Sequence, residues 1–297
     1  MTWPWRQPAY PRNMELGRIG IWWSRDGLVE AAPEIEELGY GALWMSGGFS
    51  RGVMPHFGQT LAVTSRIIVA SGIIGVWKTP AGELADSVAR LETSSPGRFL
   101  LGLGVSHAPI VEYAGIAYER PFDKMVSFLD ELDGSSPTVA PERRALAALG
   151  PKMLRLSAER SLGAHPYFVP VEHTIYAREV LGAGPLLAPE VAVVLESDAG
   201  RAREIARKYA ATYLPLPNYA GNLRRLGYKE EDVALPGSNQ VIDAVIPWGG
   251  LEKVAARLTE HLEAGADHIC IQVLTGEARF PLEQYRLLAQ ALITPTK

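Results

Sequence analysis

A glycine that follows a helix-like segment and precedes a short apolar run recurs along this chain, and this repeat constrains the fold more than any other feature. It stands at Gly39, Gly97, Gly163 and Gly265, each a few residues before a run such as Ala42–Met45. Glycine readily adopts the left-handed backbone that ends a helix, so the chain can turn directly into the next strand. Repeated turns of this kind predict parallel strands joined by crossover helices.

Eight short apolar runs are candidates for the strands, since each is brief and β-branched or aromatic enough to be buried on both faces. They are Leu16–Trp23, Ala42–Met45, Ile67–Val76, Phe99–Val105, Ala145–Leu149, His165–Val169, Val191–Leu195 and His268–Val273. Amphipathic segments predict helices over Leu28–Leu38 after the N-cap residue Asp26, and over Pro80–Leu91, Pro151–Leu162 and Leu251–Ala264, the last of the series. This alternation favours an α/β fold, a closed (β/α)8 barrel, for which 297 residues suffice.

The two ends of the expected barrel domain carry different features. We expect an N-terminal arm over residues 1–15 and a single barrel domain over residues 16–297. Between the seventh strand and the last helix lie about 55 residues, including Tyr213–Tyr219 and Asn222–Tyr228, whereas a barrel connection needs far fewer. We therefore predict an insertion there, either a lid over the C-terminal mouth or a contact with another subunit.

Composition and charge exclude several classes of protein. The net charge is −4 and no run of Lys or Arg is present, which argues against nucleic acid and membrane surfaces as partners. Cys270 is the single cysteine, so no internal disulfide is possible. No apolar stretch reaches the roughly 18–20 residues of a membrane span, and no secretion signal is present at the N-terminus. We expect a soluble, cytoplasmic protein.

Large aromatic side chains stand where predicted strands end. Four of the seven tryptophans, Trp22, Trp23, Trp44 and Trp77, follow or end the first three strands. In (β/α)8 barrels the chemistry takes place at this C-terminal face. Clustered indoles would suit a flat, conjugated ligand, and ordinary packing of apolar side chains is the alternative.

The end of the fourth strand, Gly102–His107, offers small residues and one titratable group. It resembles a truncated dinucleotide fingerprint, but His107 takes the place of the third glycine and we expect no helix directly after it because Pro109 follows. Small residues let a flat ring approach the backbone. His107 is a candidate proton donor, and a histidine that is only hydrogen-bonded in a loop is the alternative.

Two predicted helix starts could bind an anion. Gly150 and Pro151 leave free amide groups at a helix N-terminus, to which Lys152 adds a positive charge, and His173 and Thr174 stand at the next helix start. Phosphate binding and plain helix capping remain alternatives. No metal-binding motif or serine-nucleophile context is present, and we expect His261 to lie solvated on the surface of its helix.

Several segments together resemble the luciferase-like oxidoreductases, and most closely their F420-dependent branch. The resemblance extends from about Gly17 to Leu292 and rests on ELGYGALW at 37–44, ARLETSSPGRFLLGLG at 89–104, LAALGPKML at 146–154, GAHPY at 163–167 and AGADHICIQ at 264–272. It implies a TIM-barrel enzyme that uses coenzyme F420 or FMN and forms a homodimer.

The resemblance also implies where the cofactor lies. A non-prolyl cis peptide at Gly72–Ile73 would press against the back of the ring, the end of the fourth strand would line it, and His107 is the candidate catalytic residue. Arg279 would assist Lys152 and its neighbours at the cofactor phosphate. The full set of expected cofactor contacts is Trp44, Ser46, Ser71, Gly72, Ile73, Gly104, Val105, Ser106, Ala148, Leu149, Gly150, Pro151, Lys152, Met153, His173, Thr174 and Arg279, and no metal ligand is expected.

One departure from the family pattern affects the expected reaction. Several F420-using relatives carry an Asp-His pair after the second strand, where this chain has Gly47 and Gly48. We expect an oxidoreductase that transfers a hydride between F420 and a small organic substrate. The alternatives are an FMN-dependent monooxygenase and a barrel that binds a flavin or deazaflavin without turnover.

Overall fold

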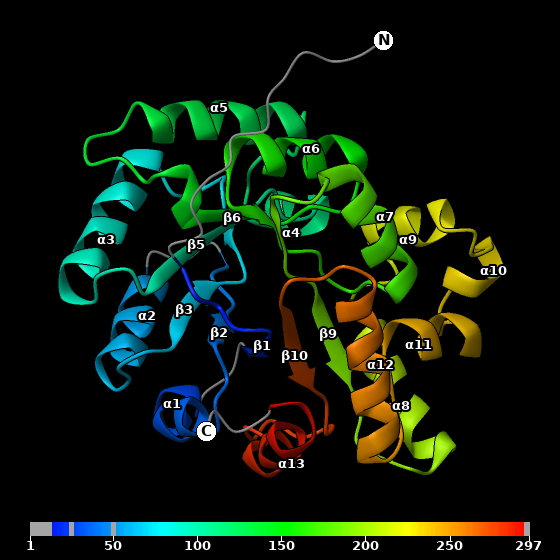
Figure 1. Ribbon diagram of the computed structural model, residues 1–297. Helices are drawn as coiled ribbons and strands as arrows, with labels where there is room; N and C mark the ends of the chain where they lie inside the picture. Colours follow the sequence, from blue (N-terminus) through cyan, green and yellow to red (C-terminus); the bar gives the residue numbers. More distant parts are fainter. Residues whose placement is uncertain (1–13, 24–26, 49–51, 294–297) are drawn as a thin grey trace.

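Eight parallel strand positions form a ring in the computed structural model, which describes residues 14–23, 27–48 and 52–293 (Figure 1). The strands are β1 (Ile19–Trp23), β2 (Ala42–Met45), β3 (Ile68–Ser71), β4 (Ile74–Gly75), β5 (Phe99–Gly104), β6 (Arg144–Leu146), β7 (Gly163–Ala164), β8 (Leu186–Leu187), β9 (Glu190–Val193) and β10 (Ile269–Val273). They pair in the order β8-β7-β6-β5-β3-β2-β1-β10-β9, and β4 continues β3 beside β5. Only Ala188 and Pro189 separate β8 from β9, so this bent segment closes the ring. The predicted TIM-barrel fold is confirmed.

The helices cover the outside of the ring. They are α1 (Leu28–Glu37), α2 (Val53–Ala62), α3 (Ala81–Ser94), α4 (Ala108–Tyr113), α5 (Pro121–Asp133), α6 (Pro151–Arg160), α7 (Val171–Leu181), α8 (Ala199–Ala210), α9 (Pro217–Arg225), α10 (Glu230–Val233), α11 (Asn239–Val245), α12 (Leu251–Glu263) and α13 (Leu282–Leu292), with a 3-10 turn at Pro141–Arg143. No helix in the described part of the chain is long and apolar enough to cross a membrane.

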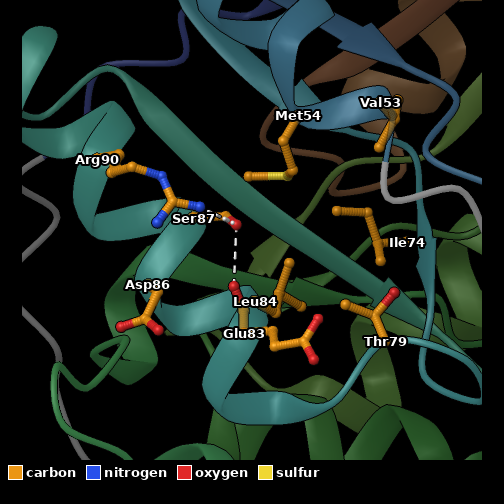
Figure 2. Close-up of a pocket in the computed structure, with 9 residues that line it drawn as sticks. All are labelled: Val53, Met54, Ile74, Thr79, Glu83, Leu84, Asp86, Ser87 and Arg90. Atoms are coloured by element: carbon orange, nitrogen blue, oxygen red, sulfur yellow. Dashed lines mark hydrogen bonds between the residues drawn. The ribbon is translucent and has the colours of Figure 1, made fainter.

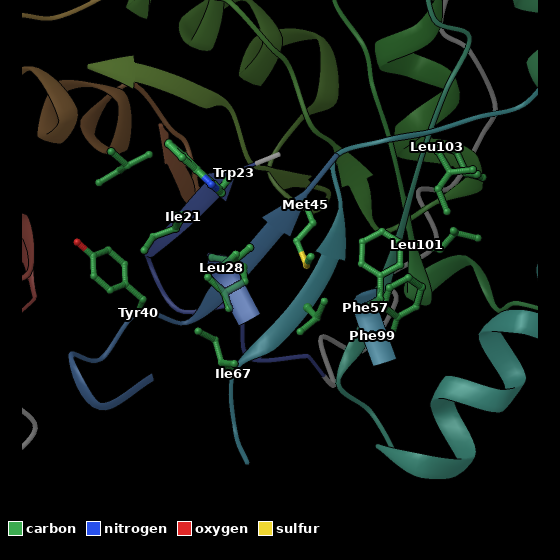
Figure 3. Packing of buried hydrophobic residues seen from close by; sticks show 14 of the residues in the cluster. Ile21, Trp23, Leu28, Tyr40, Met45, Phe57, Ile67, Phe99, Leu101 and Leu103 are labelled. Atoms are coloured by element: carbon green, nitrogen blue, oxygen red, sulfur yellow. The ribbon is translucent and has the colours of Figure 1, made fainter. Parts of the chain in front are cut away.

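Strand side chains alternate between two cores because successive residues of a strand point to opposite faces. Ile21, Leu43 and Leu101 belong to the larger core between the strands and the helices (Figure 3). Their neighbours Trp22 and Trp44 point inward and pack in the barrel interior. A strand buried on both faces therefore reads as a continuous apolar run, which is why these runs identified the strands.

The glycines after helices adopt the backbone that the sequence predicted. Gly39 has φ 89°, Gly97 has φ 76° and Gly265 has φ 103°. In this region an L side chain clashes with the backbone, whereas glycine does not. These residues turn the chain from α1, α3 and α12 into the following strands.

Three sequence-based element assignments are wrong. The sixth barrel strand is Gly163–Ala164 rather than His165–Val169, because Pro166 and Pro170 have no N–H to donate to a neighbouring strand. Leu251–Glu263 is not the last helix, since α13 follows and buries Tyr285 and other residues at helical spacing. A helix does begin directly after His107, because Pro109 falls within the first turn, where its missing N–H costs nothing.

The predicted insertion folds into α8, α9, α10 and α11, which lie together beside α7 and α12 in Figure 1. Side chains such as Leu214, Leu223 and Ile242 form a core of their own there, which also includes Val194 from the end of β9 and Leu274 from the end of β10. Two caps help to set its helix starts: Asp198 accepts the Arg201 N–H at 2.8 Å, and Ser238 accepts the Val241 N–H at 3.2 Å. Asp26 and the Trp/Pro-rich N-terminal arm lie outside the described residues, except that Met14 is buried in the barrel interior.

We expect Gly102→Ala to destabilise the protein by about 1–3 kcal/mol, because an added methyl group overpacks the barrel. A Cβ atom at residue 102 would lie 1.8 Å from the Ser71 carbonyl oxygen, a backbone atom that cannot rotate away. Gly82→Ala is the matched control: no atom lies within 4 Å of its Cβ position in α3, so it should stabilise by up to about 1 kcal/mol. Urea unfolding of both variants measures the difference, and equal stabilities would contradict the expected steric cost.

Candidate functional site

The break between β3 and β4 places a backbone turn in the wall of the barrel. The Gly72–Ile73 peptide bond is cis, as the family resemblance implied. Ser71 bridges the break, since its hydroxyl donates to the Gly102 carbonyl at 2.9 Å and accepts the Gly102 N–H at 2.8 Å. The Trp22 indole N–H donates to the Gly72 carbonyl at 3.1 Å. Ser71 is fully buried, so its side chain holds the wall together in this structure.

The glycine pair at 47–48 has a steric explanation. A Cβ atom at Gly47 would lie 2.8 Å from the Ile73 carbonyl oxygen and 2.5 Å from the Ile74 side chain. No Asp or His therefore fits at that position beside the β3–β4 break. The preceding Ser46 is half-buried and remains a candidate contact.

The end of β5 lies against this break and is held by two aromatic side chains. A Cβ atom at Gly104 would lie 2.5 Å from Ile73 Cδ1, so only glycine admits the Ile73 side chain there. The Trp77 indole N–H donates to the Val105 carbonyl at 2.7 Å, and the Tyr118 hydroxyl donates to the Ser106 carbonyl at 3.2 Å. Ser106 has φ 54°, and such strained residues cluster at functional sites.

His107 lies on the rim of the barrel, where it meets the insertion. Its Nδ1 is 3.0 Å from Asn218 Oδ1, and its ring centroid is 5.1 Å from that of Tyr219. Burial lowers the pKa of His107, although the hydrogen bond to Asn218 opposes this shift. His107 is therefore neutral near pH 7 and donates its Nδ1–H to α9. This contact fits the prediction that the insertion covers the mouth.

The four predicted tryptophans do not form one cluster. Trp44 is fully buried in the barrel interior, with its ring stacked on His165 at 4.2 Å. Trp23 packs on Phe280 in the outer core at 5.2 Å. Of the four, Trp22 contacts the β3–β4 break and Trp77 contacts the end of β5.

Two histidines inside the barrel have defined protonation states. Trp44 donates its indole N–H to His268 Nε2 at 3.1 Å, so His268 must carry its proton on Nδ1, which lies 2.9 Å from the Gly17 carbonyl. His165 Nδ1 donates to the Ala188 carbonyl at 2.7 Å, which leaves its Nε2 without a proton, and no described residue is a partner of this atom. Burial lowers the pKa of both histidines to about 4.

The start of α6 combines free amides with nearby positive charge. Pro151 occupies the first helical position, so the amides of Lys152 and Met153 have no partner inside the helix. A Cβ atom at Gly150 would lie 3.9 Å from Arg225 Nη2 at the end of α9. The side chain of Asn222 accepts a hydrogen bond from Arg225 at 3.0 Å, while its own buried Nδ2 has no partner in the described part of the chain. Ala148 is buried and Leu149 half-buried just before this turn.

The side chains at the start of α7 are buried. His173 Nε2 donates to the Leu149 carbonyl at 3.1 Å, and the Thr174 hydroxyl is 2.8 Å from His261 Nδ1. The prediction for His261 is wrong, because only 1% of its surface is exposed: its position on α12 faces α7 rather than solvent. Arg279 is exposed in the loop after β10.

A group of polar residues that the sequence did not reveal lies at the mouth between β7, β9, β10 and the insertion. It consists of Glu190, Gln272 and the tyrosines Tyr167, Tyr209 and Tyr213, whose side chains are joined by hydrogen bonds. Glu190 is fully buried at the start of β9. Two sequence features could have revealed this group: an acidic residue, Glu190, beside an apolar run, and a segment rich in tyrosine. The sequence did not connect them, because the tyrosines are far from Glu190 along the chain.

A cavity also lies away from the mouth of the barrel. It has a volume of about 350 Å³ and lies between α2 and α3, outside the barrel wall (Figure 2). In it Arg90 donates to the Ser87 hydroxyl at 2.8 Å, which donates to the Glu83 carbonyl at 2.9 Å. None of the predicted cofactor contacts lines it. Among the described residues, no group of three or more His, Cys, Asp and Glu side chains is placed to hold a metal ion.

Comparison with known proteins gives the family. The family model described as luciferase-like monooxygenase matches residues 4–268, most of the chain. The chain belongs to the luciferase-like monooxygenase family. This confirms the family to which the sequence motifs pointed.

Solved structures of other proteins share the fold of this luciferase-like protein. An F420-dependent secondary alcohol dehydrogenase in complex with an F420-acetone adduct is 16% identical, with a TM-score of 0.73 over 93% of this chain and 99% of that one. The coenzyme F420-dependent tetrahydromethanopterin reductase from Methanopyrus kandleri is 15% identical, with a TM-score of 0.70 over 93% and 98%. The oxygenating constituent of 3,6-diketocamphane monooxygenase from Pseudomonas putida, in complex with FMN, is 14% identical, with a TM-score of 0.66 over 94% and 100%. Both kinds of cofactor thus occur among its structural neighbours.

Proposed function

We propose that this protein is an F420-dependent oxidoreductase that transfers a hydride between F420 and a small organic substrate at the C-terminal mouth of the barrel. Family membership and two F420-dependent structural neighbours support the reaction class. The FMN-containing neighbour keeps an FMN-dependent monooxygenase as the second candidate. When bound, either cofactor supplies the redox chemistry, and the protein orients it and excludes water.

The observation that carries the proposal is the anion site at the start of α6, because both cofactors bear a phosphate. The free amides of Lys152 and Met153, the partial positive charge of the helix N-terminus and the Arg225 guanidinium converge near Gly150. The unpartnered Asn222 Nδ2 adds a buried donor beside Arg225. These groups fit a phosphate.

The ring of the cofactor would lie between the β3–β4 break and the end of β5. The Gly72–Ile73 backbone and the small residues Gly104 and Ser106 line that side of the barrel. Trp22 fixes the Gly72 carbonyl from inside. In this arrangement His107, on the rim, shapes the approach of the substrate.

We expect Arg225→Gln to raise the Kd for F420 about tenfold, equivalent to about 1.4 kcal/mol, since a charge-assisted contact to phosphate is lost. Arg224→Gln is the matched control, because Arg224 forms an ion pair with Glu230 instead. Fluorescence titrations with F420, FMN and riboflavin, which lacks the phosphate, measure both effects. Riboflavin binding should not respond to Arg225→Gln. A protein that binds neither F420 nor FMN at micromolar concentrations would end the proposal, and tighter binding of FMN would favour the monooxygenase.

A further inference from the structure

A chain of hydroxyl groups connects a buried carboxyl to the mouth of the barrel. Tyr209 Oη lies 3.4 Å from Glu190 Oε1 and 2.8 Å from Tyr167 Oη. Tyr167 Oη lies in turn 3.0 Å from Tyr213 Oη. Each of these groups can both donate and accept a proton, so the four side chains form a continuous path.

Two further contacts hold the path in place. Gln272 Oε1 lies 3.0 Å from both Tyr167 Oη and Tyr209 Oη, and it can accept the proton of either hydroxyl while that hydroxyl is not donating along the path. The Phe168 N–H donates to the second carboxyl oxygen of Glu190 at 3.2 Å. Phe168 has φ 55°, a left-handed backbone that is unfavourable for this residue type. The hydrogen bond to Glu190 therefore holds the strained backbone of Phe168, in the loop after β7, in place.

Glu190 is an acid that still holds its proton near pH 7. Burial raises the pKa of Glu190 to about 8, although hydrogen bonds from Phe168 and Tyr209 act in the opposite direction. The environment disfavours a carboxylate because it has too few donors to replace water. The neutral carboxyl can therefore donate its own proton to Tyr209.

The outer end of the path lies beside the expected ring site. The ring of Tyr167 is 5.2 Å from that of Trp22, which donates to the Gly72 carbonyl. His107 is a poor source of the proton, because it is neutral and its Nδ1–H is directed at Asn218. Tyr167 is half-buried and follows β7, on the side of the barrel where the strands end.

We propose that Glu190, Tyr209 and Tyr167 form a proton relay that supplies the proton of a substrate reduction at the barrel mouth, an inference that rests on the proposed function. With a reduced cofactor bound, which would supply the hydride to one atom of a C=O or polarised C=C bond, Tyr167 donates its proton to the other atom. Tyr167 takes a proton from Tyr209, and Tyr209 takes one from Glu190, which is left as the carboxylate. An oxidation follows the reverse sequence. Since these donors are uncharged, the substrate class they fit is a neutral carbonyl compound or activated alkene.

The carboxyl group is what makes this path a usable acid. Burial raises the pKa of Tyr167 and of Tyr209 well above that of an ordinary phenol. A phenol acting alone would leave a buried phenolate, whereas the relay leaves the charge on Glu190. Because general acids work best when their pKa lies near the working pH, the carboxyl is the better donor.

The protonated carboxyl is tested first on the protein without cofactor. The infrared difference spectrum of wild type minus Glu190→Gln at pH 7 should contain the C=O band of a protonated carboxyl, which disappears as the pH rises through about 8. Tyr209→Phe should shift this band, since it removes a hydrogen-bond partner of Glu190. Tyr40→Phe is the control, because it removes a buried hydroxyl that donates outside the barrel to the Tyr285 carbonyl. An ionised Glu190 at pH 7 would overturn the relay.

The transfer itself is tested on the holoenzyme with reduced F420 and a panel of neutral ketones, aldehydes and enones. Single-turnover oxidation of reduced F420 should slow in the wild type as the pH rises through about 8. Glu190→Gln and Tyr209→Phe should each lower the rate by about 10²-fold. In both variants the rate should no longer decrease as the pH rises through about 8. Unchanged rates and profiles in both variants would overturn the relay while the proposed function stands.

Binding measurements separate the two proposals. If the wild-type protein binds neither F420 nor FMN, the proposed function is refuted. The proton relay is then refuted as well, even if the infrared band of a protonated Glu190 is present. If the protein binds F420 but none of the ketones, aldehydes and enones oxidises the reduced cofactor, the proposed substrate class is wrong. Both variants should bind F420 with wild-type affinity, since Glu190 and Tyr209 form hydrogen bonds with Phe168, Tyr167 and Gln272 and none with the groups around Gly150.

Discussion

Lowering the pH from 7 to about 5 should unfold this protein. Four histidines, His165, His173, His261 and His268, are buried, and burial lowers the pKa of the first, second and fourth to about 4 and of His261 to about 3. In the unfolded chain their pKa values return to about 6.5. Below pH 6.5 the unfolded chain therefore binds protons that the folded one does not, so stability falls as the pH falls towards 4.

The size of this effect is comparable to the whole stability of a domain. The pKa shifts of about 2.5 to 3.5 units correspond to about 3–5 kcal/mol for each histidine at the acid limit. Together the four groups remove about 7 kcal/mol at pH 5 and about 15 kcal/mol at the acid limit, against the 5–15 kcal/mol typical of a folded domain. Circular dichroism and tryptophan fluorescence between pH 7 and pH 4 measure the transition.

Single-histidine variants attribute the transition to these groups. His261→Gln, whose amide can still meet the Thr174 hydroxyl, should move the acid midpoint to lower pH. His56→Gln is the control, since His56 is exposed on α2 and should leave the midpoint unchanged. A wild-type protein that stays folded below pH 4 would contradict the assignment of neutral, buried imidazoles.

Glu190→Gln should stabilise the protein at alkaline pH relative to the wild type. The folded pKa of Glu190 is raised to about 8 from an ordinary value near 4.5. Between these values the unfolded chain loses the proton while the folded one keeps it, so wild-type stability falls as the pH rises from about 4.5 to about 8. The difference amounts to about 5 kcal/mol, and the neutral glutamine abolishes it.

Urea unfolding at pH 6.5 and pH 8.5 measures this difference between the two proteins. The gap between variant and wild type should widen with pH by about 2 kcal/mol over this interval, since about half of the titration span lies above pH 6.5. Glu172→Gln is a suitable control because Glu172 is exposed on α7. A constant gap at both pH values would show that Glu190 titrates normally.

Together the two effects predict a stability maximum near pH 7, where the proton uptake of the four histidines in the unfolded chain balances that of Glu190 in the folded one. Below it the four histidines dominate the slope, and above it Glu190 does. All five groups lie inside the barrel or between its helices, where few donors or acceptors replace water. The pH dependence of the free energy of unfolding therefore measures whether these groups are buried in the core around the candidate site.

The local chemistry of the sequence predicted much of the fold. Apolar runs located seven of the eight barrel strands, because strands covered on both faces must be apolar throughout. Glycines such as Gly39 and Gly265 marked helix ends, since few other residues adopt positive φ. The segment at 165–169 was misleading because its apolar residues are buried in a loop that follows β7, where Phe168 packs against the insertion.

The candidate site was predicted only in part. Gly72–Ile73, Gly104 and Gly150 were identified from motifs of consecutive residues, and the structure places the first two side by side. Whether those residues contact a cofactor stays a prediction. Arg225 and Asn222 were missed because they reach Gly150 from α9, about 75 residues later in the chain.

The sequence by itself determined most of the strand and helix pattern, the parallel direction of the strands and the family, because periodicity, turn chemistry and consecutive motifs are local properties. Only the tertiary structure decided that His261 is buried, that no side chain fits at Gly47, and that Glu190 joins Tyr167 and two tyrosines of the insertion in one hydrogen-bonded group. These outcomes depend on which distant segments exclude water from one another. Burial and pKa are properties of that packing, and no window of the sequence contains it.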